Sequence, residues 1–253
     1  MCLLNFQFHE HPNYKLILVA NRDEAYDRPT AAAHFWEDEP FILAGRDLRK
    51  FGTWLGITKT GRFAALTNAH SSATASIASQ PKPRSRGTIV QHYLTTEMSP
   101  ETFLHDLRKQ RSLFDGFNLL VGDSETLMHY NSRLDQLIPL SPGAHGLSNA
   151  TLDTPWPKVV EGNRRLAQYV KQSATLSPTV LLDLFGKPAD TANSQKTNTN
   201  QETDALFISS SLNGTVSSTA LFIDNNDFVT FAERRYNQTE QIEENQFQFQ
   251  ITP

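Results

Sequence analysis

Apolar residues gather in short runs near both ends of the chain, and these runs predict strands. Residues 2–9 and 15–21 are separated by a His-Pro-Asn turn, which is typical of a β-hairpin. Residues 218–224 and 227–236 flank an Asn-Asn pair and predict a second hairpin. Further strands are predicted at 41–45, 53–58, 62–68, 117–122 and 126–130.

The middle of the chain carries helix signals, in which a capping side chain is followed closely by proline. Such signals at 99–100, 153–155 and 177–178 predict helix starts, and residues 85–94 predict a further helix. Residues 187–204 are polar and nearly devoid of apolar side chains, so we expect a mobile surface loop there.

Length, composition and net charge limit the classes of protein to which this chain can belong. With 253 residues and 38% hydrophobic side chains, the chain can bury a substantial core, and one domain is the simplest count. No stretch approaches the roughly 20 apolar residues that span a bilayer, so we expect a soluble protein without stable membrane insertion. The net charge of −4 offers no general attraction to nucleic acid, and we expect no nucleic-acid partner.

Cys2 is the single cysteine, so an internal disulfide and any multi-cysteine metal site are excluded. The N-terminal residues lack the basic and apolar regions of a secretory signal, and we therefore expect a cytoplasmic protein.

The position of Cys2 has a chemical interpretation. Because cysteine is small, an aminopeptidase can remove Met1, which leaves Cys2 with a thiol and a free α-amino group. The reference pKa values of the amine, about 7.7–8.0, and of the thiol, about 8.5, allow the amine to act as base for the thiol. The alternative is a small buried cysteine at the start of a strand.

The order and spacing of several motifs resemble the NRDE family, also called the TANGO2 (transport and Golgi organisation protein 2) family. The resemblance covers nearly the whole chain. It rests on Cys2, Asn21-Arg22-Asp23-Glu24, Gly45-Arg46-Asp47, Gly52-Thr53-Trp54-Leu55-Gly56, Leu66-Thr67-Asn68, His145-Gly146-Leu147-Ser148-Asn149, Pro155-Trp156-Pro157-Lys158 and Ser217-Ser218-Thr219.

This family is regarded as related to N-terminal nucleophile hydrolases. The resemblance therefore implies an α+β fold, a four-layer αββα sandwich, formed by residues 1–253 as a single domain. The strand-rich ends and the helical middle of the chain fit that architecture.

The resemblance also implies catalytic residues. In cysteine-type hydrolases of this superfamily, an arginine and an aspartate follow the nucleophile at the end of the next strand, and Arg22 and Asp23 are the nearest counterparts. We expect Arg22 to lower the pKa of the Cys2 thiol, while Asp23 or Asn21 orients the α-amino group. Arg22 and Asp23 are adjacent, whereas two residues separate them in the hydrolases. The alternative is a charged turn held by hydrogen bonds.

Acyl transfer also needs hydrogen-bond donors where negative charge develops on oxygen. The resemblance implies Asn68 and Asn149 as these donors. Either asparagine could instead satisfy backbone groups of a turn. An arginine that often completes the hydrolase site has no clear counterpart, since Val216 stands before Ser217.

Two other sequence patterns are weaker candidates for a functional site. His9 and His11 are expected on one strand face as a two-ligand metal edge, but no third ligand is identifiable, so exposed hairpin histidines are favoured and no metal is expected. The segment 146–150 comes within one residue of a serine nucleophile elbow, yet the next helix signal starts several residues later.

Two classes of function follow. The first is a cysteine hydrolase or acyltransferase that attacks a linear amide or thioester of a small-molecule substrate and requires no cofactor. The second is a carrier or chaperone on the same fold, with an apolar ligand such as haem or an acyl-lipid. For haem, no axial ligand is singled out by the sequence.

Overall fold

The computed structural model describes residues 2–69, 84–173, 175–186, 205–238 and 240–252. The predicted loop at 187–204 lies outside the described residues. The contacts of the chain separate two compact units. Unit 1 comprises Met1–Asp27, Pro142–Leu147 and Asp153–Gln248, and unit 2 comprises Arg28–Ser141, Ser148–Leu152 and Phe249–Pro253. The prediction of a single domain stays a prediction.

Unit 1 is built on a six-stranded antiparallel sheet with the strand order β10-β1-β2-β11-β12-β13. Both predicted hairpins, β1–β2 and β11–β12, are confirmed. The strands are β1 (Cys2–His11), β2 (Tyr14–Ala25), β10 (Gly143–Leu147), β11 (Asn213–Asp224), β12 (Phe228–Tyr236) and β13 (Gln241–Gln250).

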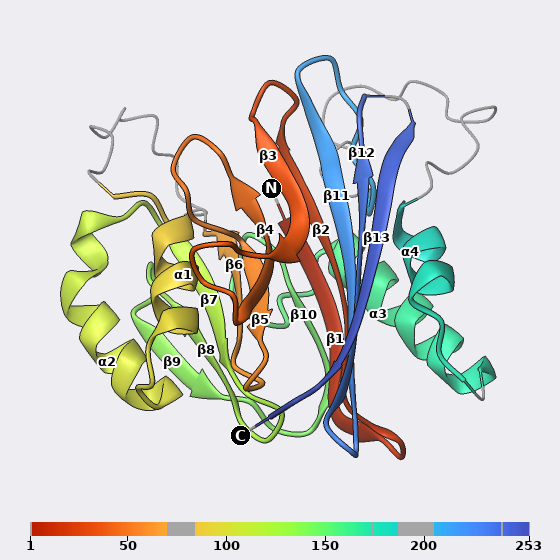
Figure 1. Cartoon of the computed structure of the whole chain (residues 1–253), viewed down its shortest axis with the longest axis horizontal. Coiled ribbons are helices and arrows are strands. Elements are labelled where there is room, and N and C mark those ends of the chain that lie inside the picture. The colour runs from red at the N-terminus through yellow and green to blue at the C-terminus, as the bar shows by residue number, and fades with distance from the viewer. Residues whose placement is uncertain (1, 70–83, 174, 187–204, 239, 253) are drawn as a thin grey trace. The chain divides into compact units, whose positions relative to one another are not determined.

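Helices α3 (Pro157–Gln172) and α4 (Pro178–Gly186) cover one face of this sheet (Figure 1). Their apolar side chains form a core with those of β1, β2 and β11. Helix α4 begins where its Ser-Pro signal predicted it. The core includes Leu3, Ile17, Val19, Leu166, Leu181, Leu182, Phe185, Ala220 and Phe222.

Helix α3 begins two residues after the start signal at 153–155, with Trp156 at the N-cap position. Asp153 does not cap the helix, because its carboxylate accepts hydrogen bonds from the backbone N–H of Gly146 and pairs with His145, both at 2.8 Å. Its φ of +58° directs the chain into a turn before the helix. The capping interpretation of Asp153 is therefore wrong.

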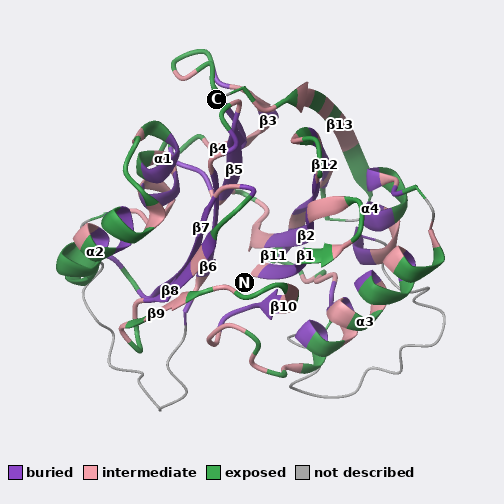
Figure 2. Ribbon diagram, turned by 90° about the horizontal axis from the view of Figure 1, so that it is seen from below, coloured by how far each residue is buried: buried purple, intermediate pink, exposed green. Residues whose placement is uncertain are grey.

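Unit 2 is built on a seven-stranded antiparallel sheet with the strands in sequence order from β3 to β9. Helices α1 (Gly87–Thr95) and α2 (Pro100–Gln110), followed by a 3-10 turn (Arg111–Leu113), pack on one face of it. Figure 2 shows β6 and β7 buried along their length and much of α2 exposed. The strands are β3 (Thr30–Phe35), β4 (Ile42–Asp47), β5 (Leu55–Thr58), β6 (Phe63–Asn68), β7 (Phe117–Gly122), β8 (Leu127–Asn131) and β9 (Gln136–Pro139).

The helix start predicted at 99–100 is confirmed in unit 2. The hydroxyl of Ser99 accepts a hydrogen bond from the backbone N–H of Thr102 at 3.2 Å, and Pro100 occupies the first helical position. None of the helices in the described part of the chain is long and apolar enough to cross a membrane.

The backbone at His9 and His11 is irregular, so the two histidines do not share a strand face as the two-ligand metal interpretation assumed. A bulge between Phe8 and His11 interrupts the pairing of β1 with β2, and His9 has a φ of +47°. The alternation of side chains that the metal interpretation assumed is therefore lost. The ring of His9 packs on Phe8 and that of His11 packs on Tyr14.

A buried asparagine fixes α3 to the sheet of unit 1. The side-chain amide of Asn5 in β1 donates to the backbone oxygen of Val159 at 3.0 Å and to Oδ1 of Asn163 at 2.7 Å. A Cβ atom on Gly162 would lie 2.1 Å from Oδ1 of Asn5, so the close approach requires glycine there. This contact positions the first turn of α3 over β1.

We expect Asn5→Ala to lower the free energy of unfolding by about 1–3 kcal/mol, because the hydrogen bonds of the Asn5 amide to Val159 and Asn163 are lost. Urea denaturation measures the effect. Asn225→Ala is the matched control, since Asn225 also donates to a backbone oxygen, that of Pro12 at 2.7 Å, but at an exposed hairpin end. Equal losses in the two variants would contradict the anchoring role.

Candidate active site

The register of the first hairpin places Cys2 directly opposite Arg22 in unit 1. Side chains of directly opposed residues share one face of a sheet, so the thiol and the guanidinium lie side by side. Cys2 is half-buried, whereas Arg22 is only 6% exposed. Glu24 lies 3.5 Å from a guanidinium nitrogen of Arg22. The buried guanidinium of Arg22 thus lies beside the thiol of Cys2.

Burial is the main influence on the thiol and raises the pKa of Cys2. The positive chain terminus, Arg22 and the backbone N–H of Asp23 act in the opposite direction, and the carboxylate of Asp23 adds to the rise. Arg22 therefore lowers the thiol pKa as expected, but burial outweighs it. The thiol is protonated at neutral pH and needs a base to become a nucleophile.

Asp23 is a second carboxyl group of this cluster, besides Glu24. Burial raises the pKa of Asp23 to about 6, against a hydrogen bond from Thr215 and the positive charges of the chain terminus, Lys158 and Arg22. The hydroxyl of Thr215 in β11 donates to Oδ1 of Asp23 at 2.7 Å. Asp23 is thus held in one orientation, with a pKa close to neutral pH.

Lys158, the last residue of the Pro155-Trp156-Pro157-Lys158 motif, is a buried charged residue near Asp23. It is the second residue of α3 and is 1% exposed. Its Nζ lies 5.8 Å from the centre of the Trp156 ring, and its charge lowers the pKa of Asp23. A lysine in the first helical turn opposes the helix dipole, and that was the available signal in the sequence.

Asn21 faces the helix side of the sheet. Its amide donates to the backbone oxygens of Phe185 at 3.1 Å and Leu206 at 2.8 Å, and its oxygen accepts from the hydroxyl of Ser218 at 2.6 Å. One amide hydrogen thus joins β2 to the end of α4, and the other joins it to Leu206 in the segment before β11. The roles of Asp23 and Asn21 in orienting the α-amino group stay predictions.

Asn68 and Asn149 lie together in unit 2. The side-chain amide of Asn149, which is fully buried, donates to the backbone oxygen of Asn68 at 2.9 Å. Asn118 in β7 donates to the backbone oxygens of Ser148 at 3.2 Å and Ala150 at 2.7 Å. These bonds fix the segment that carries Asn149. The oxyanion role of Asn68 and Asn149 stays a prediction.

No cluster of three or more His, Cys, Asp or Glu side chains suited to a metal ion occurs among the described residues. The cluster in unit 1 brings a thiol beside the buried cation of Arg22, next to the carboxyl of Asp23, whose raised pKa is lowered in part by the charge of the buried Lys158.

Comparison with known sequences identifies the family to which this chain is similar. The model of the family described as Transport and Golgi organisation 2 matches residues 1–238. The Transport and Golgi organization 2 homolog of Mus musculus is 33% identical over 279 aligned residues, which cover 99% of this chain and 99% of the mouse protein. The Homo sapiens homolog is 38% identical over 199 residues, covering 72% and 69% of the two chains.

Comparison with solved structures identifies the fold of this chain. Penicillin V acylase from Agrobacterium tumefaciens matches with a TM-score of 0.51 and 12% identity, covering 91% of this chain and 82% of the acylase. The expected α+β fold of the N-terminal nucleophile hydrolase type is confirmed.

We expect the pH dependence of stability to depend on Asp23. Its folded-state pKa of about 6 exceeds the unfolded value of about 3.9, so the folded chain holds an extra proton between these values. The free energy of unfolding therefore falls as the pH rises from about 4 to about 6. Asp23→Asn removes this decrease.

Urea denaturation at pH 4, 5, 6 and 7 measures the effect. Asp115→Asn is the control, since Asp115 is an exposed aspartate, and it keeps the decrease of the parent protein. The same pH dependence in Asp23→Asn and in the parent would show that Asp23 is not the titrating group.

Proposed function

Since the chain belongs to the Transport and Golgi organisation 2 family and has the fold of N-terminal nucleophile hydrolases, we propose that it is a cysteine hydrolase or acyltransferase. It acts on a linear amide or thioester and forms an acyl-enzyme on Cys2. The observation that carries this proposal is the pairing of Cys2 with the buried Arg22, next to the carboxyl of Asp23.

The reaction begins once Met1 has been removed and the α-amino group of Cys2 is free. The amine takes the proton of the thiol, and the thiolate attacks the carbonyl carbon of the substrate. A carbon–sulfur bond forms while the carbonyl electron pair moves to oxygen. When the intermediate collapses, the protonated amine gives its proton to the departing nitrogen or sulfur. Water or another acyl acceptor then attacks the thioester and releases Cys2.

The surrounding charges have separate roles in this proposal. Arg22 stabilises the thiolate, which burial otherwise disfavours. Asp23 orients the amine and balances its charge after proton transfer. Lys158 and Thr215 lower the pKa of Asp23, and thereby keep its carboxyl ionised at neutral pH.

The donors for the oxyanion are those predicted from the sequence. Asn68 and Asn149 are assigned by the family resemblance, and each well-placed donor contributes about 3–4 kcal/mol to lowering the barrier. The predicted cytoplasmic location is part of the proposal, because a reducing compartment keeps a single thiol available as a nucleophile.

The alternative predicted from the sequence is a carrier of haem or an acyl-lipid on the same fold. The two functions differ in the fate of the ligand, since an enzyme releases a cleaved product and a carrier releases the ligand intact.

We expect Cys2→Ala to abolish turnover of acyl thioesters and N-acyl p-nitroanilides, because the variant lacks the nucleophile. Its urea midpoint stays close to that of the parent, since Cys2 is a half-buried strand terminus. Release of p-nitroaniline or free thiol is followed by absorbance. Turnover that survives in folded Cys2→Ala would contradict a nucleophilic role.

We expect Lys158→Met to raise the pKa of Asp23 and to move the acidic limb of the pH–rate profile to higher pH, because a buried cation is lost. Lys171→Met is the matched control, since Lys171 is an exposed lysine of the same helix. The measurement is thiol labelling between pH 5 and 9. A profile that keeps its shape in folded Lys158→Met would contradict the electrostatic role.

A further inference from the structure

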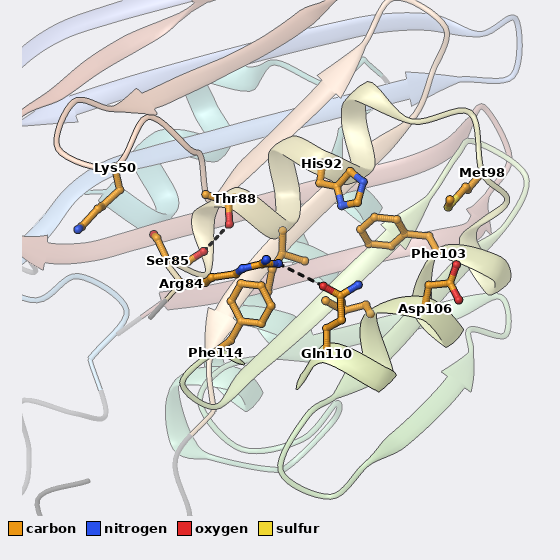
Figure 3. A pocket seen from close by; sticks show the side chains of 12 residues that line it. Lys50, Arg84, Ser85, Thr88, His92, Met98, Phe103, Asp106, Gln110 and Phe114 are labelled. Atoms are coloured by element: carbon orange, nitrogen blue, oxygen red, sulfur yellow. Dashed lines mark hydrogen bonds between the residues drawn. The ribbon is translucent and has the colours of Figure 1, made fainter. Parts of the chain in front are cut away.

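Unit 2 contains a cavity of about 590 Å³ beside α1 and α2 (Figure 3). This volume lies within the range of about 300–1,000 Å³ that is typical of small-molecule sites. None of its lining residues belongs to the cluster around Cys2. The lining consists of Lys50, Arg84, Ser85, Thr88, Ile89, His92, Met98, Phe103, Asp106, Leu107, Gln110 and Phe114.

The apolar part of the lining belongs to the core of unit 2. Phe103, Leu107 and Phe114 are each less than a tenth exposed and pack with the other side chains of that core. The ring of His92 lies against Phe103, with 5.3 Å between the ring centres. An apolar ligand would therefore meet a surface that is held in place by core packing.

The charged side chains of the lining are the cations Lys50 and Arg84 and the anion Asp106. Arg84 donates from Nη1 to the neutral side chain of Gln110 at 3.2 Å, and no carboxylate of the described residues forms a salt bridge with Arg84 or Lys50. Asp106, at the other end of the cavity, is paired with Lys109 at 2.8 Å. The two cations at one end therefore lack a compensating anion within the cavity.

The first turn of α1 adds to this positive potential. It contains no acidic residue, and the N-cap residue Arg86 makes no capping hydrogen bond with its side chain. Ser85 and Thr88 line the cavity at this turn, close to Arg84 (Figure 3). The start of a helix favours anions, in the same direction as the two side-chain cations.

We propose that this cavity binds a small amphipathic anion. The oxyanion head of the ligand, such as a phosphate, lies at the end of the cavity that Lys50 and Arg84 line. Its apolar body lies over Phe103, Leu107 and Phe114. The cavity is a second site, independent of the reaction proposed for Cys2.

Isothermal titration calorimetry with n-octyl phosphate tests the proposal. We expect one saturable site on the full chain. Affinity falls about fourfold for each methylene removed in a series from octyl to butyl phosphate, since each methylene is buried. Affinity also falls as the salt concentration rises. n-Octyltrimethylammonium, which has the same tail and the opposite charge, does not bind at this site.

Two variants locate the site. The double variant Lys50→Gln and Arg84→Gln weakens binding of n-octyl phosphate roughly tenfold, because two ionic contacts are lost. Lys171→Gln removes an exposed lysine far from the lining in sequence and leaves the affinity unchanged. Equal affinities in the double variant and the parent would overturn the proposal.

Methyl NMR of methionine gives an independent readout. The methyl signal of Met98, which lines the cavity, shifts during the titration, while that of Met128, which does not line it, serves as reference. Labelling of the Cys2 thiol proceeds at the same rate with and without n-octyl phosphate. Protection of Cys2 by n-octyl phosphate without a shift of Met98 would place the binding at Cys2 and overturn the proposal.

Discussion

Strand β2 hydrogen-bonds to β1 on one side and to β11 on the other, and this double pairing determines where each charged side chain of the unit 1 cluster lies. Arg22 is opposite both Cys2 and Ser217, and Asp23 is opposite Thr215. A shift of one residue would exchange the two faces of the strand and separate Cys2 from the guanidinium. The short turn that pairs His11 with Tyr14 sets this register, because the length of a hairpin loop determines which residues of the two strands lie opposite each other.

This arrangement buries charged side chains, which is energetically unfavourable. Arg22 and Lys158 are almost completely buried, and each would be strongly unfavourable without nearby compensation. Glu24 pairs with Arg22, and the carboxyl of Asp23 lies within the influence of both cations. The pKa of Asp23 is nevertheless raised to about 6, because burial outweighs the attraction of these charges. Such balances are typical of sites that move protons near neutral pH, which is what the hydrolase proposal requires of the cluster.

Interactions between residues that are close in sequence were predicted well. The two hairpins depend on a few adjacent residues, and so does the cap of α2 at Ser99. The approach of Arg22 to Cys2 follows from a hairpin with a short turn. Strand β10 was missed, since Gly143–Leu147 has no alternating apolar pattern and forms only because it pairs with β1.

The rest of the candidate site depends on contacts between distant residues. Thr215 reaches Asp23 across 192 positions, and no local pattern marks it. Lys158 was visible only as an unusual lysine at a helix start. Asn21 looked like a site residue because of its neighbours, whereas its bonds to Phe185 and Leu206 hold the helix side of the sheet together. The sequence thus indicated the strand to which the hydrolase proposal assigns its charged residues, but not the distant residues that control the charge of Asp23.

The most direct measurement is intact-protein mass spectrometry of the untagged protein, before and after a small thiol-directed acylating probe is added at neutral pH. The hydrolase proposal predicts a mass lower by one methionine and rapid addition of one probe at Cys2. A chain that keeps Met1 and labels slowly would lack the α-amino base next to the thiol, and that result would contradict the proposed mechanism.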